Sequence, residues 1–315
     1  QQIMDQLREV VESLRTGEVL HELCLPPTEI QTICRRARED EHIKIRFVKN
    51  HRVPPSTCPG AKKRGASRRA ALQALLVTTL GGLAMFVGAV ILVVQAGTNS
   101  LSAILAAYAA PGSTLTGPLI DTAIVLLLVG ALSKSAIFPF HFWLPGAMAA
   151  PTPVSAYLHA AAVVKAGIFL LMRFSPAFHA TPVWNVCLIG FGLFTAALGA
   201  WFALQQTDLK KLMAYSTVSQ LGLIVAAIGV GTPVALAAAM VHTIAHALFK
   251  SGLFMMVGVV DHSAGTRDLR RLPALRREMP ASFAVMAVGC ASMAGLPPLL
   301  GFVSKESIFT ALRDA

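Results

Sequence analysis

Apolar runs long enough to cross a lipid bilayer fill most of the chain after residue 70. A transmembrane helix needs about 20 predominantly apolar residues, and seven stretches have that character. They are Ala71–Gly97, Pro118–Trp143, Pro153–Phe174, Pro182–Gln205, Leu209–Val230, Val234–Val260 and Ala281–Phe309. The pattern therefore predicts an all-α fold, a polytopic membrane helix bundle with about seven transmembrane helices.

Residues 1–66 have a different, polar character. Apolar residues recur at helical spacing in Met4–Thr16, and a second short helix is predicted for Thr28–Asp40. Residues 41–69 hold several prolines and the run AKKRGASRRA, which is typical of a loop or of disorder. We therefore expect a polar N-terminal segment over residues 1–66 and a transmembrane domain over residues 67–315.

The composition agrees with a multi-pass membrane protein and excludes a soluble enzyme. Hydrophobic residues make up 55% and charged residues 14% of the 315 residues, and the mean hydropathy is +0.62. The net charge of +11 does not indicate nucleic-acid binding, because the positive residues cluster between apolar runs. The five cysteines show neither zinc spacing nor a disulfide framework, so we expect no metal site. The sequence shows no flavin, nucleotide or iron–sulfur motif, and we expect no cofactor and no catalytic residue.

Basic residues also predict the orientation of the chain. When the loops are assigned alternately to the two sides of the bilayer, twelve lysines and arginines fall on one side, against Arg173 and Arg313 on the other. The twelve are Lys62, Lys63, Arg64, Arg68, Arg69, Lys210, Lys211, Arg267, Arg270, Arg271, Arg276 and Arg277. The positive-inside rule makes that side cytoplasmic, so we expect an inner (plasma) membrane protein with cytoplasmic basic loops.

Three ionisable residues share one face of the sixth apolar stretch. His242, His246 and Lys250 follow one another at intervals of four residues, so a helix stacks them over about two turns. Ionisable groups within a membrane are costly and usually functional, and histidine and desolvated lysine exchange protons near neutral pH. The column predicts a proton relay. The alternative is that each histidine bonds a backbone carbonyl of a neighbouring helix. A zinc protease is a poor interpretation, because Thr243 stands where HExxH needs glutamate.

Other polar residues within apolar stretches extend the predicted relay. Lys134 lies midway along its stretch between Ser133 and Ser135, whose hydroxyls can bond its ammonium. Its alternative is a lysine that snorkels to the interface. His159 and Lys165 lie six residues apart in the third stretch, on different faces of a helix.

Two of the stretches contain helix-breaking residues next to a lysine. Pro139 follows Lys134, and Pro297–Pro298 precedes Lys305. Proline removes a backbone donor, and broken backbone at membrane depth is tolerated where it is buried or lines a cavity. Paired interrupted helices indicate a transporter built from inverted repeats. Lys305 therefore joins the predicted relay, with a simple interfacial pair between Lys305 and Glu306 as the alternative.

The remaining charged segments are interpreted as interfacial or solvated. The segment Asp261–Arg277 is predicted to be a solvated cytoplasmic linker that serves topology or contact with a partner. Asp208, Lys210 and Lys211, at the start of the fifth stretch, are interpreted as interfacial anchors.

Several long motifs carry a family resemblance. GALSKSAIFPFHFWLPGAMAAPTPVSAYLHAAAVVKAG, HTIAHALFKSGLFM and SMAGLPPLLGFVSKE resemble the proton-pumping antiporter-like family. This family includes the large membrane-arm subunits of respiratory complex I and the A subunit of Mrp-type sodium/proton antiporters. The run DHSAGTRDLRRL is most similar to the Mrp A subunit. The resemblance covers about residues 67–315 and leaves residues 1–66 as a segment that is not native to the family.

The resemblance implies a fold of about fourteen core helices with inverted repeats, in which the seven stretches are helices six to twelve and helices seven and twelve are broken. The family's residues at the matching positions form a hydrated axis that conducts protons. The implied relay is Lys134, His159, Lys165, His242, His246, Lys250 and Lys305, with helix breaks at Pro139, Pro297 and Pro298. The family pairs its helix-seven lysine with a glutamate on helix five. This chain shows no such helix, so we expect an incomplete or chimeric gene product.

Three functions stay open at this point. The first is the A subunit of an Mrp-type antiporter, a secondary transporter that exchanges cytoplasmic Na⁺ for outside H⁺ together with other subunits in the lipid bilayer. The second is a non-redox, proton-pumping membrane subunit of an NADH:quinone oxidoreductase or a related hydrogenase. The third is an inactive truncated or chimeric fragment.

Overall fold

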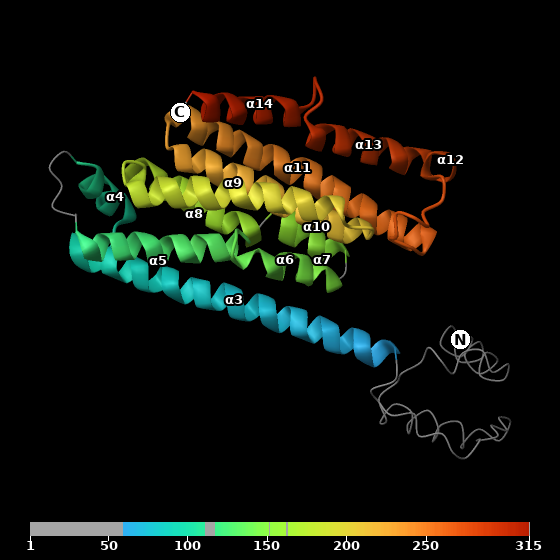
Figure 1. Ribbon diagram of the computed structural model, residues 1–315, viewed down its shortest axis with the longest axis horizontal. Helices are drawn as coiled ribbons and strands as arrows, with labels where there is room; N and C mark the ends of the chain where they lie inside the picture. The colour runs from blue at the N-terminus through green and yellow to red at the C-terminus, as the bar shows by residue number, and fades with distance from the viewer. Residues whose placement is uncertain (1–58, 111–116, 151, 162, 315) are drawn as a thin grey trace, which may run out of the picture. The chain divides into compact units, whose positions relative to one another are not determined.

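The computed structural model describes residues 59–110, 117–150, 152–161 and 163–314, and Figure 1 shows that these residues form helices joined by short connections. The all-α prediction is confirmed over these ranges. The predicted helices Met4–Thr16 and Thr28–Asp40 lie outside the described residues. The chain divides into two compact units, residues 1–69 and 70–315, and the candidate site lies within the second.

Helix α3 begins earlier than the sequence pattern indicates. It runs over Pro59–Ala96, so the loop predicted for residues 41–69 is wrong from residue 59 onward. Proline is well tolerated at the first helical position, because its missing N–H has no partner there. The alanines, lysines and arginines that follow favour helix. The glycines and the charge run are loop signals, but here the helix propensity of the neighbouring residues prevails.

Five helical segments in the described part of the chain are long and apolar enough to cross a membrane. They are Ser67–Ala96, Thr152–Phe178, Pro182–Leu204, Leu209–Val230 and Pro233–Ala264. The corresponding helices are α3, then α7 (Thr152–Ala156) with the π-helix η3 (Tyr157–Ala161) and α8 (Val163–Phe178), then α9 (Pro182–Leu204), α10 (Leu209–Val230) and α11 (Pro233–Ala264). The short helix α4 (Leu101–Ala109) follows α3. The two other predicted stretches are each interrupted, so neither forms one long helix.

The first interruption follows Lys134. Helix α5 (Pro118–Lys134) ends there, and the chain continues through η1 (Phe140–Phe142), α6 (Trp143–Gly146) and η2 (Ala147–Ala149), with Pro139 just before η1. The Trp143 indole N–H donates to the Ser133 carbonyl at 3.0 Å. This bond supplies a partner for one of the carbonyls that a helix end leaves free. The break is therefore closed by protein groups, as backbone at membrane depth requires.

The second interruption separates α13 (Pro280–Ala294) from α14 (Leu300–Arg313), with α12 (Leu275–Glu278) preceding them. Gly295 ends α13 in the left-handed conformation at φ +87, and its N–H donates to the Ala291 carbonyl at 3.0 Å. This is the usual role of a glycine after a helix. Pro297 and Pro298 occupy the connection. A Cβ on Gly301 would overlap the Ser292 carbonyl oxygen, so glycine is what lets α14 begin beside α13.

Helix α10 lies at the centre of the bundle. In the apolar stretch of α10, 67% of the residues are buried inside the bundle, against 22% in the apolar stretch of α9. Helices α9 and α10 approach closely because a glycine of each helix faces the backbone of the other. A Cβ on Gly192 of α9 or on Gly222 of α10 would lie 2.6 Å from a backbone nitrogen of the opposite helix. Small residues permit such approaches between membrane helices. Helix α10 also packs against α11, beside which it runs in Figure 1, and against α14.

Candidate functional site

The column predicted on α11 is buried inside the bundle. His242, His246 and Lys250 have no exposed surface, and the four-residue spacing places them on one face of the helix. That face meets polar groups of α10 and α14, which the contacts of His242 and Lys250 identify. The column therefore lies where α11 meets α10 and α14.

His242 bonds side chains on two other helices. Its Nδ1 lies 2.9 Å from the Ser304 hydroxyl of α14, and its Nε2 lies 3.0 Å from the Gln220 side-chain oxygen of α10. The alternative that this histidine bonds a backbone carbonyl is therefore wrong. An imidazole with both nitrogens hydrogen-bonded has a fixed orientation. Through these two bonds His242 of α11 connects to α10 and to α14.

His159 and His246 are buried without a hydrogen-bond partner among the described residues, at either ring nitrogen. The ring centroid of His159 lies 4.8 Å from that of Phe254, and the centroid of His246 lies 5.4 Å from that of Phe249. Buried polar groups are usually paired, so each exception calls for an explanation, and a chemical role is one such explanation. The nitrogens of these two rings are not committed to structural bonds, so the carbonyl-bonding alternative does not describe them either.

His159 lies in η3, the π-helical turn between α7 and α8. Single π-helical turns inside helices occur frequently at functional sites. Both His159 and Lys165, although six residues apart, contact α11. The His159 ring packs against Phe254 in a tilted arrangement, and Lys165 Nζ donates to the Thr243 carbonyl at 2.8 Å.

The buried lysines are held by neutral oxygen atoms. Lys250 Nζ donates to the Met213 carbonyl at 3.1 Å and to the Ser216 hydroxyl, both on α10. Lys165 donates to the carbonyl of Thr243. Across the described residues, no ion pair includes a lysine of the predicted relay. A cation without a carboxylate partner is held less tightly in its charged form than one in an ion pair, which suits a group that gives up a proton.

Lys305 joins the two halves of the interrupted helix. It belongs to α14, yet its Nζ donates to the Met293 carbonyl at 2.6 Å and to the Ala294 carbonyl at 3.5 Å, at the end of α13. The carboxyl end of a helix carries partial negative charge and favours cations. In the described part of the chain Lys305 forms no ion pair with Glu306, which is exposed, so the interfacial-pair alternative is wrong.

Lys134 is half-buried at the end of α5 and is not joined to the others. The expectation that Ser133 and Ser135 bond its ammonium is wrong. Their hydroxyls donate instead to the Gly130 carbonyl at 2.9 Å and the Val164 carbonyl at 3.0 Å, because buried carbonyls near the helix end need donors. Among the described residues the Lys134 ammonium makes no hydrogen bond or ion pair.

The sequence analysis missed two site residues, Ser216 and Gln220, and it did not foresee the burial of Lys210. Ser216 and Gln220 are four residues apart on α10, and both bond the α11 column. This spacing on a membrane helix was a usable signal. Lys210 was interpreted as an interfacial anchor, but its side chain is only 2% exposed and its Nζ donates to the Ala150 carbonyl. Lys210 therefore faces Ala150, next to η2, whereas Lys211 of the same turn is exposed.

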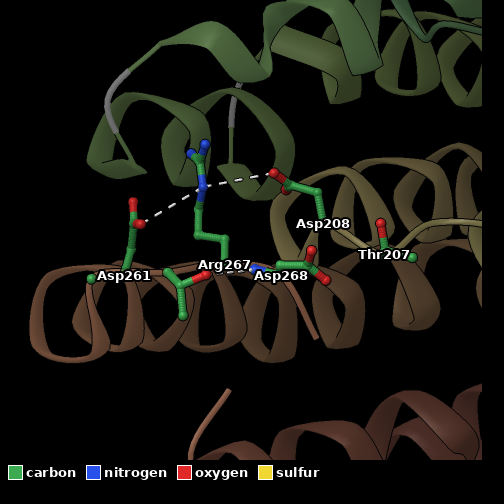
Figure 2. A pocket seen from close by; sticks show the side chains of 7 residues that line it. Thr207, Asp208, Asp261, Arg267 and Asp268 are labelled. Atoms are coloured by element: carbon green, nitrogen blue, oxygen red, sulfur yellow. Dashed lines mark hydrogen bonds and ion pairs between the residues drawn. The ribbon is translucent and has the colours of Figure 1, made fainter. Parts of the chain in front are cut away.

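The loop after α11 is docked on the start of α10 rather than only solvated. Figure 2 shows Arg267 between Asp208 and Asp261, 3.7 Å from each carboxylate. The Leu209 N–H donates to the Arg267 carbonyl at 3.0 Å, and the Asp208 carboxylate also accepts from the first N–H groups of α10. The segment Asp261–Arg277 is thus partly ordered by α10, which corrects the expectation of a simple solvated linker.

The Asp268–Arg270 pair in this loop gives a pH prediction. Arg270 donates to both Asp268 carboxylate oxygens, at 3.0 and 2.7 Å, and these bonds lower the pKa of Asp268 to about 2. Because the folded-state pKa is depressed, the stabilisation from this pair is complete above about pH 3.9, the ordinary value for Asp. It is lost as the pH falls through about 2, where the Asp268 carboxylate takes up a proton. Carboxyl ¹³C NMR of the protein in micelles should show this midpoint, and Arg270→Gln should return it toward the ordinary value. A midpoint near the ordinary value in the unaltered protein would contradict the pairing.

Comparison with known proteins places this fold and site in a family. Residues 59–315 match the family model described as "NADH:quinone oxidoreductase/Mrp antiporter, TM". The chain belongs to this family of helical membrane subunits, which confirms the resemblance inferred from the motifs. The match confirms a multi-pass membrane protein with a helical membrane domain.

Relatives in this family are named as antiporter subunits. The chain is 52% identical over 244 residues to a probable K⁺/H⁺ antiporter A/B subunit of Rhizobium meliloti, covering 77% of this chain and 24% of the relative. It is 47% identical over 266 residues to the A subunit of the Na⁺/H⁺ antiporter of Alkalihalophilus pseudofirmus, covering 80% and 33%. The chain therefore spans about a quarter to a third of the length of these relatives.

Two solved structures share the fold. The Mrp complex from a Dietzia species matches with a TM-score of 0.73 and 57% identity, over 78% of this chain and 27% of that one. The membrane-bound sulfane sulfur reductase, an archaeal respiratory membrane complex, matches with a TM-score of 0.72 and 26% identity, over 78% and 50%. The architecture is thus common to antiporter and respiratory assemblies, and the sequence is more similar to the antiporter.

Proposed function

We propose that this chain is the proton-conducting part of the A subunit in an Mrp-type cation/proton antiporter. The observation that carries the proposal is the buried column His242, His246 and Lys250, which α10 and α14 hold with neutral polar groups. Lys165 donates to a carbonyl of α11, Lys305 donates to a carbonyl at the end of α13, and His159 packs against Phe254 of α11. Protons move along these groups in exchange for an alkali cation.

The proposed orientation follows the basic loops. The N-terminal positive cluster, the start of α10 and the loop after α11 face the cytoplasm of a cell whose inner (plasma) membrane holds the protein. The partners are the other subunits of the antiporter assembly, and the cation is Na⁺. Relatives named for Na⁺ and for K⁺ are both similar to this chain, so both cations belong in the assay.

A second function is a proton-pumping membrane subunit of a respiratory complex. The likeness to the archaeal sulfane sulfur reductase favours it, since the fold there belongs to a respiratory assembly. Redox chemistry would then take place in partner subunits. The 57% identity to the Mrp complex, against 26% to the reductase, favours the antiporter.

Transport in inverted vesicles tests the choice. The complete gene product, assembled with its partners, should dissipate a preformed pH gradient when Na⁺ or K⁺ is added. The His246→Gln variant should lose this response, because a buried imidazole of the column is missing. A pH-sensitive dye reports the gradient, and vesicles without the assembly are the control. Proton movement that requires a redox substrate and ignores both cations would overturn the antiporter in favour of the respiratory complex.

A further inference from the structure

His242 makes two side-chain hydrogen bonds, and one of its partners, Ser304, makes a third hydrogen bond to the backbone of α14. Its Nδ1 faces the Ser304 hydroxyl at 2.9 Å, and its Nε2 faces the Gln220 oxygen at 3.0 Å. The Ser304 hydroxyl also donates to the Gly301 carbonyl at 3.2 Å. Because Gly301 lies in the first turn of α14, the imidazole is linked through one hydroxyl to the start of the second half of the interrupted helix.

The donors and acceptors of this cluster restrict the states it can adopt. The Gln220 oxygen only accepts, so the Nε2 that faces it carries a hydrogen. The Ser304 hydroxyl has one hydrogen and two lone pairs. When that hydrogen goes to the Gly301 carbonyl, the Ser304 oxygen accepts from Nδ1–H and the ring is a satisfied cation. When the ring is neutral, Nδ1 has a lone pair and the hydroxyl turns to donate to it.

The charged groups around His242 are all positive or are themselves imidazoles. Lys165 of α8 and Lys305 of α14 act on the ring through space, and His246 lies one turn further along α11. No carboxylate in the described part of the chain forms an ion pair with His242. The oxygens of Gln220 and Ser304 are therefore the groups that stabilise a charged ring, because hydrogen bonds to the charged form favour it.

We propose that Gln220 and Ser304 are positioning residues of the proton pathway, in which Gln220 holds His242 in the Nε2–H tautomer and the exchanged proton is carried on Nδ1, beside Ser304. This inference rests on the proposed function of His242 in the relay. An arriving proton forms the Nδ1–H bond, and the Ser304 hydroxyl hydrogen turns from Nδ1 to the Gly301 carbonyl. Release of the Nδ1 proton to the next base of the track reverses both changes. The proton on His242 and the hydrogen bonding in the first turn of α14 therefore change together.

Substitutions at Gln220 test the tautomer in the assembled complex. Gln220→Glu keeps an acceptor on Nε2–H and adds a negative charge, so antiport should continue to a higher pH, with the alkaline limb of the pH profile displaced by about 1 unit or more. Gln220→Met has similar volume but no acceptor, so the tautomer is no longer fixed and the rate should fall about 10-fold or more without loss of assembly. An unchanged profile in Gln220→Glu together with full activity in Gln220→Met would overturn the inference.

Substitutions at Ser304 test the second half of the inference. Ser304→Ala removes the acceptor for Nδ1–H and should displace the alkaline limb to lower pH, whereas Ser304→Thr keeps a hydroxyl and should restore the profile. ¹⁵N NMR of histidine-labelled protein gives a readout independent of transport. The resonances assigned by their loss in His242→Gln should show a protonated Nε2 in the neutral ring of the unaltered protein, and an Nδ1–H tautomer there would overturn the proposal.

The controls separate this inference from the proposed function. If His242→Gln leaves antiport intact, the relay through His242 is wrong and the proposed function fails with it. If His242→Gln abolishes antiport while the Gln220 and Ser304 variants keep the normal rate and pH profile, only the positioning role is wrong. Assembly of every variant is checked by co-purification of the partner subunits.

Discussion

Replacement of Lys250 with methionine is expected to reduce antiport by about 100-fold or more, because a positioned proton-transfer group contributes about 10²–10⁴-fold in rate. Lys250 has no exposed surface, and its ammonium is held by the Met213 carbonyl and the Ser216 hydroxyl rather than by a carboxylate. Methionine fills similar space and takes no proton. The measurement is cation-dependent dissipation of a pH gradient in inverted vesicles that contain the whole assembly.

The Lys250→Arg variant shows whether the charge or the proton matters. Arginine keeps the positive charge but does not release its proton in proteins, so a relay fails with arginine as it does with methionine. Lys211→Met is the matched control, since Lys211 is an exposed lysine in the first turn of α10 and should leave transport unchanged. Full activity in Lys250→Arg would show that position 250 supplies only a fixed charge, and it would remove the central member of the proposed track.

Replacement of Trp143 with alanine is expected to give the largest loss of stability, about 3–5 kcal/mol, because it empties a buried site of the largest side chain. Trp143 is 2% exposed and closes the first interruption by its bond to the Ser133 carbonyl. Trp143→Phe keeps most of the volume and removes the bond, so it should cost about 1–3 kcal/mol. Denaturant unfolding of the assembled protein in micelles, followed by circular dichroism, measures both.

Trp201 provides the control for this effect. It is also a tryptophan of a membrane helix, but its side chain is 64% exposed on this chain. Trp201→Ala should therefore change the free energy of unfolding far less than Trp143→Ala. Equal effects of the two substitutions would mean that the interruption after Lys134 does not depend on the indole, and that some other contact holds the broken end of α5.

The sequence predicted those features that depend on local pattern. The spacing of His242, His246 and Lys250 predicts a shared face whatever the neighbouring helices are, and the structure buries all three residues. Proline also acts locally, so the two interruptions at Pro139 and at Pro297–Pro298 lie where the chain suggested. The five long apolar spans follow from length and hydropathy alone.

Other features depend on contacts between distant segments, which one sequence does not display. Gln220 shares one face of α10 with Ser216, but only the packing of α11 shows that its partner is His242. Lys210 stands at the end of an apolar run, where an anchoring lysine and a buried lysine have the same sequence signature, and only its contact with the Ala150 carbonyl distinguishes them. The docking of Arg267 on Asp208 likewise joins residues separated by a whole helical hairpin.

The position of Lys305 gives the seam between α13 and α14 a mechanical property. The two half-helices are tied by an ammonium group that reaches back to the Met293 and Ala294 carbonyls. A neutral amine is a weaker donor than an ammonium, so this tie loosens whenever the lysine is emptied of its proton and tightens when it is refilled. In the proposed relay, the protonation state of Lys305 would therefore set how firmly α13 and α14 are held together, so that one side chain would both carry the proton and connect the two half-helices.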